Sequence, residues 1–207
     1  MNLSTLFRLR ENLHLDKKTL VILRWIAIFG QFTAVNLVYF YLKLEFSINF
    51  AYLVIFFGLI TNLFLQFKVK SIQIRDFNAS VFLAYDLFQL SILLYLTGGI
   101  SNPFSILIII PTIVSSTFLS MGTTLILGII TLICLFLLTI FHQPFPGIHK
   151  NSFTFPELYL TGFFISIVIG LVFLSYFGIR FSGETKRRSE AINKLQQVIA
   201  KEYELES

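Results

Sequence analysis

A short uncharged stretch between two apolar segments is the first candidate site. Residues 97–104 read TGGISNPF. Gly98 and Gly99 can end a helix because glycine adopts the left-handed conformation at little cost. Asn102 is a favoured N-cap, and Pro103 suits the first position of the next helix. One interpretation of these residues is therefore a tight corner between two helices.

The same stretch is also a candidate ligand site. Its glycines would let a ligand approach the backbone, and the N-terminus of the next helix offers unpaired N–H groups and a positive dipole end. Asn102 adds a side-chain amide wherever it is not used as the cap, and Phe104 adds an aromatic face. Hydrogen-bond donors beside a flat ring at a membrane interface would suit the headgroup of a quinone.

Polar residues inside the apolar segments form a second candidate group. Asp86 and, one helical turn later, Gln89 lie well inside one segment, where a carboxylate is costly unless it is satisfied. Arg24 and Asn62 lie at similar depths in two other segments, and Gln31 follows Arg24 by two turns. We expect an inward-facing polar cluster with an Arg24–Asp86 pair. The pair is either a static bridge or a switch whose pairing differs between two states.

The segments that carry these residues are long enough to cross a bilayer. The chain has 207 residues, of which 56% are hydrophobic and 13% charged, unlike an ordinary soluble domain. A helical span needs about 20 apolar residues, and these runs lack the alternation of barrel strands. Six segments qualify: 20–42, 48–67, 78–96, 103–120, 122–141 and 158–180. The sequence therefore predicts an all-α membrane protein, a six-transmembrane-helix bundle with a cytoplasmic C-terminal linker helix.

Basic residues indicate the orientation of the bundle. They gather in the N-terminal part, in the connection after the second predicted span and in the C-terminal tail, and only Lys43 and Lys150 lie elsewhere. The positive-inside rule then places both termini in the cytoplasm, and places the 97–104 stretch and the 142–157 connection on the outer side. The net charge of +5 is a topology signal, and we expect no nucleic-acid partner.

The C-terminal tail is polar and helix-prone. Ile192, Leu195 and Ile199 keep coiled-coil spacing for little more than one heptad, which fits either a solvated helix or a parallel dimer stalk that carries a signal from the membrane. The chain ends inside this predicted helix, so we expect a further segment to follow. The predicted division is a cytoplasmic segment 1–19, a transmembrane sensor domain 20–181 and a cytoplasmic signalling linker 182–207.

The remaining reactive residues form no catalytic constellation. His14, His142 and His149 lack the spacing of a helical metal pair, and Cys134 has no second cysteine to pair with. Metal-binding and phosphate-binding motifs are missing from the sequence. We therefore expect no bound metal and no catalytic residue in this chain.

Three stretches resemble the membrane input domain of the RegB/PrrB redox-sensing histidine kinases. They are LRWIAIFGQ (23–31), LAYDLFQLSILLYLTGGISNPF (83–104) and LYLTGFFISIVIGLVFLSYFGIR (158–180). The resemblance covers nearly the whole chain, and its most specific part is the run Gly98-Gly99-x-x-Asn102-Pro103-Phe104, which matches the family heptapeptide.

The resemblance implies a function for this run. The family heptapeptide is associated with ubiquinone sensing. In this chain the glycines would allow close approach, Asn102 and the first amides of the fourth helix would donate to a quinone oxygen, and Phe104 would pack on the ring. The resemblance also implies a homodimer in the bacterial inner membrane and a full-length histidine kinase that phosphorylates a response regulator. The phospho-accepting histidine, ATP-binding domain and redox-active cysteine of the family have no counterpart in this chain.

Two rival interpretations remain. The first is a small six-helix carrier or channel whose path is lined by Arg24, Asp86 and Gln89. The absence of an internal repeat, and of an obviously broken helix at mid-depth, counts against it. The second is a membrane anchor with no ligand.

Overall fold

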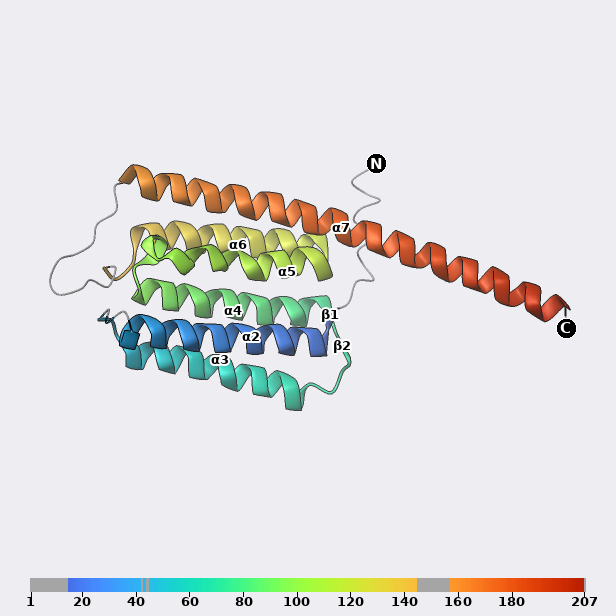
Figure 1. The fold of residues 1–207 in the computed structure, drawn as a ribbon, viewed down its shortest axis with the longest axis horizontal. Coiled ribbons are helices and arrows are strands. Elements are labelled where there is room, and N and C mark those ends of the chain that lie inside the picture. Colours follow the sequence, from blue (N-terminus) through green and yellow to red (C-terminus); the bar gives the residue numbers. More distant parts are fainter. Residues whose placement is uncertain (1–14, 42, 44, 145–156, 207) are drawn as a thin grey trace.

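The structure, a computed structural model, describes residues 15–41, 43, 45–144 and 157–206 as a bundle of near-parallel helices (Figure 1). Its elements are β1 (Leu15–Asp16), α2 (Lys17–Asn36), η1 (Leu37–Tyr41), α3 (Ile48–Lys68), β2 (Gln73–Ile74), α4 (Asp76–Leu96), η2 (Gly99–Ser101), η3 (Pro103–Ile109), α5 (Ile110–Phe118), α6 (Met121–Ile140) and α7 (Glu157–Glu206). Helix α2 packs on α3, and α4 packs on α3, α5 and α6. Helix α7 lies along α5 at the far side of the bundle.

Four described helical segments are long and apolar enough to cross a membrane. They are Lys17–Tyr41, Ile48–Lys68, Asp76–Leu96 and Met121–Ile140. Two shorter apolar segments, Pro103–Phe118 and Phe163–Tyr176, correspond to the fourth and sixth predicted spans. The prediction of a helical transmembrane bundle is thus confirmed in outline, while the count of six spans stays a prediction.

The fourth predicted span is not one uniform helix. It begins as a 3-10 helix over Pro103–Ile109 and continues as the α-helix Ile110–Phe118, with Pro111 in its first turn. Proline has no N–H to donate back along a helix, so an α-helical ladder can begin at Pro111 but cannot run through it. The predicted span 103–120 is therefore helical over Pro103–Phe118, but its first part is a 3-10 helix, which was not predicted.

A small ladder at one end of the bundle was not predicted. Leu15 pairs with Ile74 and Asp16 with Gln73 in an antiparallel register. The side chains of Leu15 and Ile74 are buried, and Lys17 Nζ donates to the carbonyl oxygen of Val69 at 2.5 Å. This ladder joins the start of α2 to the α3–α4 connection. Residues 15–19 of the predicted N-terminal segment 1–19 therefore belong to β1 and to the start of α2, and residues 1–14 lie outside the described residues.

The same end of the bundle holds α4 and α6 together. Asp76 accepts hydrogen bonds from Ser120 N at 2.7 Å, from Ser120 Oγ at 2.8 Å and from Thr123 Oγ1. Ser120 is the N-cap of α6. A carboxylate at a helix N-terminus satisfies free N–H groups and favours the positive dipole end. The first residue of α4 thereby fixes where α6 begins.

Small polar residues join α5 to α6 and α7. Thr112 and Thr131 share a hydrogen bond of 2.8 Å between buried hydroxyl groups. A Cβ atom added at Gly178 of α7 would lie 2.2 Å from Ser116 Oγ of α5, so the two helices approach closely there. Such small-residue contacts are typical of helix packing in membranes, where dispersion and interhelical hydrogen bonds replace the hydrophobic effect.

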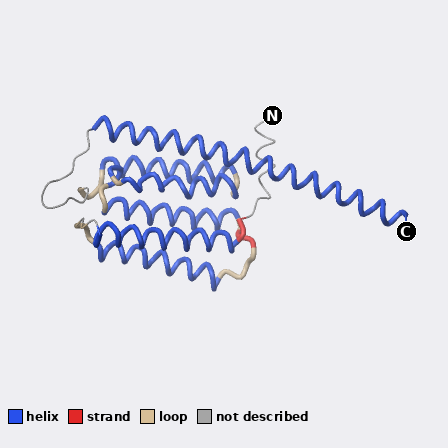
Figure 2. Tube along the Cα trace, in the orientation of Figure 1, coloured by secondary structure: helices blue, strands red, loops and turns tan. Residues whose placement is uncertain are grey.

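Helix α7 continues well beyond the bundle (Figure 2). It is a single helix of 50 residues, so the predicted boundary at 181/182 is a change of composition and not a break in the backbone. It leaves the bundle at the end where β1 and β2 lie. The side chains of Ile192, Leu195 and Ile199 are exposed on this extension, and their role in a dimer stalk stays a prediction.

Candidate functional site

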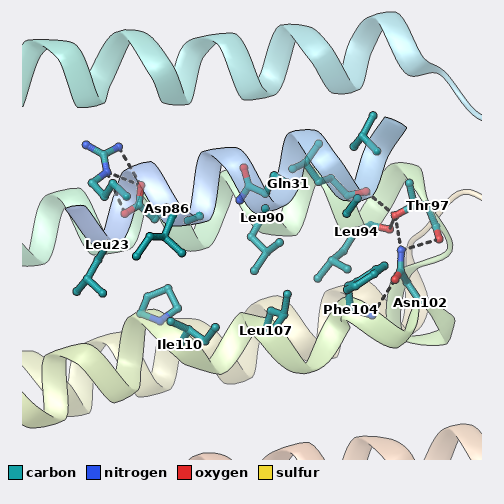
Figure 3. Close-up of a pocket in the computed structure, with 18 of the residues that line it drawn as sticks. Leu23, Gln31, Asp86, Leu90, Leu94, Thr97, Asn102, Phe104, Leu107 and Ile110 are labelled. Atoms are coloured by element: carbon teal, nitrogen blue, oxygen red, sulfur yellow. Dashed lines mark hydrogen bonds and ion pairs between the residues drawn. The ribbon is translucent and has the colours of Figure 1, made fainter. Parts of the chain in front are cut away.

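A groove separates α2 from the η3–α5 segment, and α4 forms its floor (Figure 3). Its volume is about 490 Å³, and apolar side chains make up most of its lining. Leu23 of α2 and Leu107 and Ile110 of the opposite wall are partly exposed along it. Both candidate groups of the sequence analysis reach this groove, the Arg24–Asp86 pair at one end and the corner at the other.

The groove is open because its two walls pack less on one another than α2 packs on α3. Gly30 lines the wall formed by α2, and a Cβ atom placed there would meet nothing within 4 Å. Pro103 and Phe104 line the opposite wall, where the Phe104 side chain is 42% exposed. Ligand sites in proteins are commonly apolar clefts of about 300–1,000 Å³ with a few polar groups, and the groove has both properties.

The corner is built by hydrogen bonds within the corner itself. Gly98 and Gly99 have φ angles of 104° and 56°, the left-handed conformation that glycine allows. The Asn102 side-chain oxygen accepts from Phe104 N at 2.9 Å. Its Nδ2 donates to Thr97 Oγ1 at 2.7 Å and to Thr97 O at 3.2 Å. The predicted cap is present as the bond from Phe104 N to the Asn102 side-chain oxygen, and the Asn102 amide nitrogen is engaged by Thr97.

The two glycines do not line the groove. Both are buried, and a Cβ atom at Gly99 would lie 2.5 Å from the Leu138 carbonyl oxygen and 2.7 Å from His142. Gly99 brings the corner against the end of α6, and neither glycine is the point of ligand approach that was expected from the sequence. The part of the heptapeptide that reaches the groove is Asn102, Pro103 and Phe104.

The first amides of η3 are also engaged. Phe104 N donates to the Asn102 side chain, and Ser105 N donates to the Asn102 backbone oxygen at 2.9 Å. Pro103 has no N–H to offer. The N–H donors expected at the corner from the sequence therefore already have protein acceptors in this structure.

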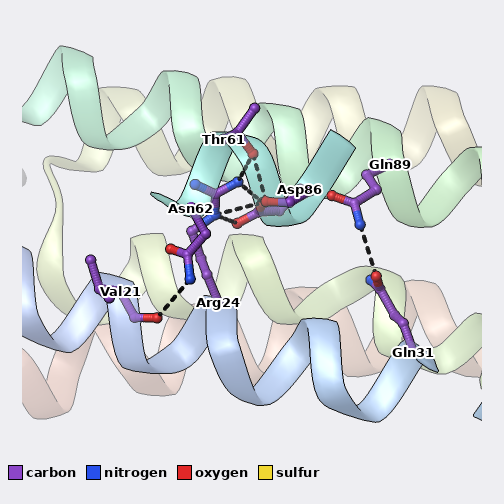
Figure 4. A network of polar contacts seen from close by, with 8 residues as sticks. Val21, Arg24, Gln31, Thr61, Asn62, Asp86 and Gln89 are labelled. Carbon is purple, nitrogen blue, oxygen red and sulfur yellow. Dashed lines mark hydrogen bonds and ion pairs between the residues drawn. The ribbon is translucent and has the colours of Figure 1, made fainter. Parts of the chain in front are cut away.

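The end of the groove away from the corner holds an ion pair between Arg24 of α2 and Asp86 of α4 (Figure 4). We call this pair and the polar residues around it the inner cluster. Arg24 Nε donates to the two carboxylate oxygens of Asp86 at 2.9 and 3.1 Å, and Nη2 lies 2.9 Å from Asp86 Oδ1. Nη2 also donates to Thr61 Oγ1 of α3 at 2.8 Å. The cluster thus ties three helices together, and Thr61 is a member that sequence reasoning missed.

The arginine of this pair is more deeply buried than the carboxylate. The Arg24 side chain is 3% exposed and that of Asp86 is 22% exposed. The guanidinium also lies over Phe82 and Tyr85, 5.2 and 5.7 Å from their ring centres. Such cation–π contacts stabilise a desolvated arginine. Both residues line the groove, and Asp86 is the more exposed of the two.

Asn62 does not bond to this pair. Its Nδ2 donates to the Val21 carbonyl oxygen at 3.4 Å. Its Oδ1 and Arg24 Nη1 are both buried and have no hydrogen-bond partner among the described residues. The buried cluster is therefore incompletely satisfied, which is uncommon for polar groups in a protein interior.

The two glutamines form a separate contact along the groove. Gln89 Nε2 donates to Gln31 Oε1 at 2.8 Å, and Gln31 lines the groove while Gln89 is buried. The Gln89 amide lies against Gly58 of α3, where an added Cβ atom would be only 2.5 Å from its nitrogen and oxygen. Gly58 is a second residue that sequence reasoning missed, since a lone glycine inside an apolar helix has no distinguishing pattern.

Among the described residues, the cysteine and the histidine considered in the sequence do not line the groove. Cys134 is buried in α6, and His142 Nδ1 lies 2.8 Å from the Gln143 carbonyl oxygen. His14 and His149 lie outside the described residues. Across the described ranges, no three histidine, cysteine or acidic side chains gather into a possible metal site.

Several apolar helices of membrane-spanning length, together with a buried ion pair, define a multi-pass helical membrane protein. The family model of the PilS-like transmembrane domain, a six-span family, matches residues 10–193, and the chain belongs to this family. Two proteins named Sensor histidine kinase RegB, both from Cereibacter sphaeroides, are 33% identical over 189 residues. The matched region is 91% of this chain and 41% of each relative.

These matches show that the chain is a membrane input domain of the RegB/PrrB family. The chain spans less than half the length of the curated relatives it matches, because 41% of each relative is covered. No solved structure matches the chain.

Proposed function

We propose that this chain is the redox-sensing input module of a two-component sensor histidine kinase and that it binds ubiquinone in the groove, beside the 98–104 corner. The observation that carries the proposal is the groove itself, an apolar cleft of about 490 Å³ that ends at Asn102, Pro103 and Phe104. A quinone has a flat polar ring and a long apolar tail, and the groove offers an aromatic face and long apolar walls for them.

The proposal includes the setting of the module. The protein is a homodimer of six-span subunits in the bacterial inner membrane, with both termini in the cytoplasm. Helix α7 leads to a kinase core that autophosphorylates and passes the phosphate to a response regulator. The two relatives named as sensor histidine kinases and the exit of α7 from the bundle support this arrangement.

The packing of α5 offers a route for the signal. Pro111 and Val114 of α5 line the groove, and Ser116 of the same helix lies at the close contact with Gly178 of α7. A ligand that moves α5 would therefore move α7. Binding shifts the signalling equilibrium only by the difference in affinity for the two states. A difference of about 1–2 kcal/mol changes that equilibrium roughly five- to thirtyfold.

Quinone binding by the purified chain in nanodiscs tests the proposal. We compare the wild type with Gly30→Leu, which places a side chain into the groove, and with Gly122→Leu as the matched control. Gly122 lies at the start of α6, away from the groove, and an added Cβ atom meets nothing within 4 Å at either glycine. We expect the wild type and Gly122→Leu to bind and Gly30→Leu to lose binding.

A second variant tests the corner. Asn102→Ala combined with Phe104→Ala removes the cap and the exposed ring, and we expect it to weaken binding while the bundle stays folded. Failure of the wild type to bind would refute the proposed function. Equal binding by the wild type and Gly30→Leu would show that the quinone binds elsewhere.

A further inference from the structure

We propose that the outer surface of the α2–α3 contact binds an anionic phospholipid of the surrounding bilayer, at the end of the bundle where β1 and β2 lie (Figure 1). We call this surface the α2–α3 seam. Six exposed side chains define it: Lys18, Ile22, Trp25, Phe29, Gln66 and Lys70. None of these six lines the groove, so the inference goes beyond the proposed function and does not depend on quinone binding.

The α2 side of the seam is one continuous stripe of the helix. Its members are Lys18, Ile22, Trp25 and Phe29. They follow one another by four, three and four residues, the spacing that places side chains on a single helical face. The Ile22 and Phe29 side chains are 57% and 72% exposed, so protein does not cover this face. The stripe begins with a cation and continues with apolar groups, which is the order of headgroup and acyl chains in a phospholipid.

A hydrogen bond across the seam indicates its depth in the membrane. Trp25 Nε1 donates to Gln66 Oε1 at 3.2 Å. Tryptophan gathers at the membrane–water interface, where its ring contacts lipid and its N–H finds a polar partner. Lys18 lies seven residues earlier, about 10 Å along the helix axis, and therefore on the headgroup side of Trp25. The exposed Gln66 amide nitrogen carries hydrogens that can donate to a phosphate or ester oxygen.

The α3–α4 connection brings a second cation to this end of the seam. Lys17 N donates to the Ile72 carbonyl oxygen at 3.0 Å, and Lys17 Nζ donates to the Val69 carbonyl oxygen at 2.5 Å. Lys70 lies between these two acceptors in the chain, and Lys18 follows Lys17. Both Lys18 and Lys70 are exposed, and neither forms an ion pair with another described residue. Two free ammonium groups from distant parts of the sequence are therefore gathered here.

The carboxylates at this end of the bundle do not offset these charges. Asp76 accepts hydrogen bonds from Ser120 and Thr123 at the start of α6. Asp16 is only partly exposed, and its Oδ1 is buried. The seam therefore presents positive charge beside exposed apolar side chains, a combination that is typical of binding sites for anionic lipids.

The charge of the lipid follows from this surface. A phosphodiester accepts charge-assisted hydrogen bonds from lysine, and a zwitterionic lipid carries an ammonium group of its own that weakens the attraction. The positive-inside bias accounts for lysines at this end, but not for their place beside the Trp25–Gln66 bond. Each basic residue near a membrane surface strengthens the binding of anionic lipid about fivefold. We therefore expect two lysines to favour an anionic lipid about tenfold or more.

Trp25 supplies the measurement, because it is the only tryptophan of the chain. Bromine atoms on acyl chains quench indole fluorescence on contact, so quenching reports which lipid lies against Trp25. The full chain in bilayers is titrated with brominated phosphatidylglycerol, which is anionic, and separately with brominated phosphatidylcholine, which is zwitterionic. We expect phosphatidylglycerol to quench Trp25 of the wild type at about one tenth of the lipid fraction that phosphatidylcholine requires.

Three double variants locate the preference. Lys18→Gln with Lys70→Gln removes both charges and keeps the indole probe, so the preference should fall to about one. Lys43→Gln with Lys194→Gln is the matched control, because both lysines are exposed and lie away from the seam, at the other end of α2 and on the α7 extension. The control should keep the wild-type preference. Lys18→Arg with Lys70→Arg keeps the charges and should keep the preference too.

The opposite results overturn the inference. Equal quenching of the wild type by the two lipids would do so, and so would an equal loss of preference in the control pair, which would show attraction by net charge alone. A preference that disappears in sodium phosphate, but not in sodium chloride of the same ionic strength, would show that the lysines take a free phosphate instead of a lipid. If the double glutamine variant does not fold, each single glutamine variant should lower the preference several-fold, and an unchanged preference in both would contradict the proposal.

Discussion

The two polar ends of the groove are built in different ways. At the corner, Asn102 bonds to residues two and five positions away in the sequence. In the inner cluster, Arg24 bonds to Thr61 and Asp86, which are 37 and 62 positions away. The corner is thus a local structure, whereas the inner cluster depends on three separate helices coming together.

The two ends also differ in how many of their polar side-chain atoms have hydrogen-bond partners. The Asn102 side chain uses its oxygen and its amide nitrogen within the corner. The inner cluster leaves Arg24 Nη1 and Asn62 Oδ1 buried without a partner among the described residues. A self-satisfied corner gives a fixed shape. An incompletely satisfied cluster between helices has more to gain from a change in packing or from a ligand, because unpaired buried polar groups are costly.

The largest predicted effect breaks the inner cluster. Asp86→Ala leaves Arg24 buried without its counter-ion, and removing one partner of a buried pair costs about 3 kcal/mol or more of unfolding free energy. Denaturant unfolding in detergent micelles measures this loss. Arg24→Met with Asp86→Leu should recover most of the stability, since an apolar pair carries no desolvation penalty. A double variant as unstable as Asp86→Ala would contradict this account.

The next effect concerns the glutamine contact. Gly58→Ala forces the Gln89 amide away from Gln31, because the new Cβ atom would lie 2.5 Å from that amide. We expect a loss of about 1–3 kcal/mol, the usual cost of overpacking. Gly128→Ala is the matched control, with its nearest neighbour at an ordinary 3.8 Å. The control should be neutral or more stable, and equal losses in both variants would rule out a special role for Gly58.

A smaller effect is expected at the corner. Asn102→Ala removes the cap and should cost about 1 kcal/mol in thermal unfolding. Asn102→Asp keeps the oxygen that accepts from Phe104 N and loses the donor to Thr97, so it should lie between the wild type and Asn102→Ala. If Asn102→Asp were as unstable as Asn102→Ala, the bond to Phe104 N would contribute nothing.

The smallest effect is the coupling between the two ends. Asn102 and Gly58 share no hydrogen-bond partner, so the costs of Asn102→Ala and Gly58→Ala should add to within about 0.5 kcal/mol. A double-mutant cycle of unfolding free energies measures the coupling without ligand. Clear non-additivity would mean that the corner and the inner helices form one unit and that the corner is not a local structure.

The corner could be predicted in detail because its geometry is local. Glycines that allow positive φ, an N-cap residue and a proline act within a few positions of one another. The Arg24–Asp86 pairing could be predicted from the depth of the two residues in their spans, because charged residues at one level of a membrane bundle usually pair with each other. Thr61 and Gly58 could not be found, since neither threonine nor glycine in an apolar helix indicates which neighbour it will face.

The amino-acid sequence was enough to predict a helical membrane protein, the position of most of its helices and the polar residues that need partners. These properties follow from composition, span length and local backbone preference. The packing of the helices was needed to find that α2 and α5 leave a groove between them and that the Arg24–Asp86 pair lies at one end of it, with Asp86 the more exposed member. Those features depend on the packing of helices distant in sequence, which local preferences do not specify.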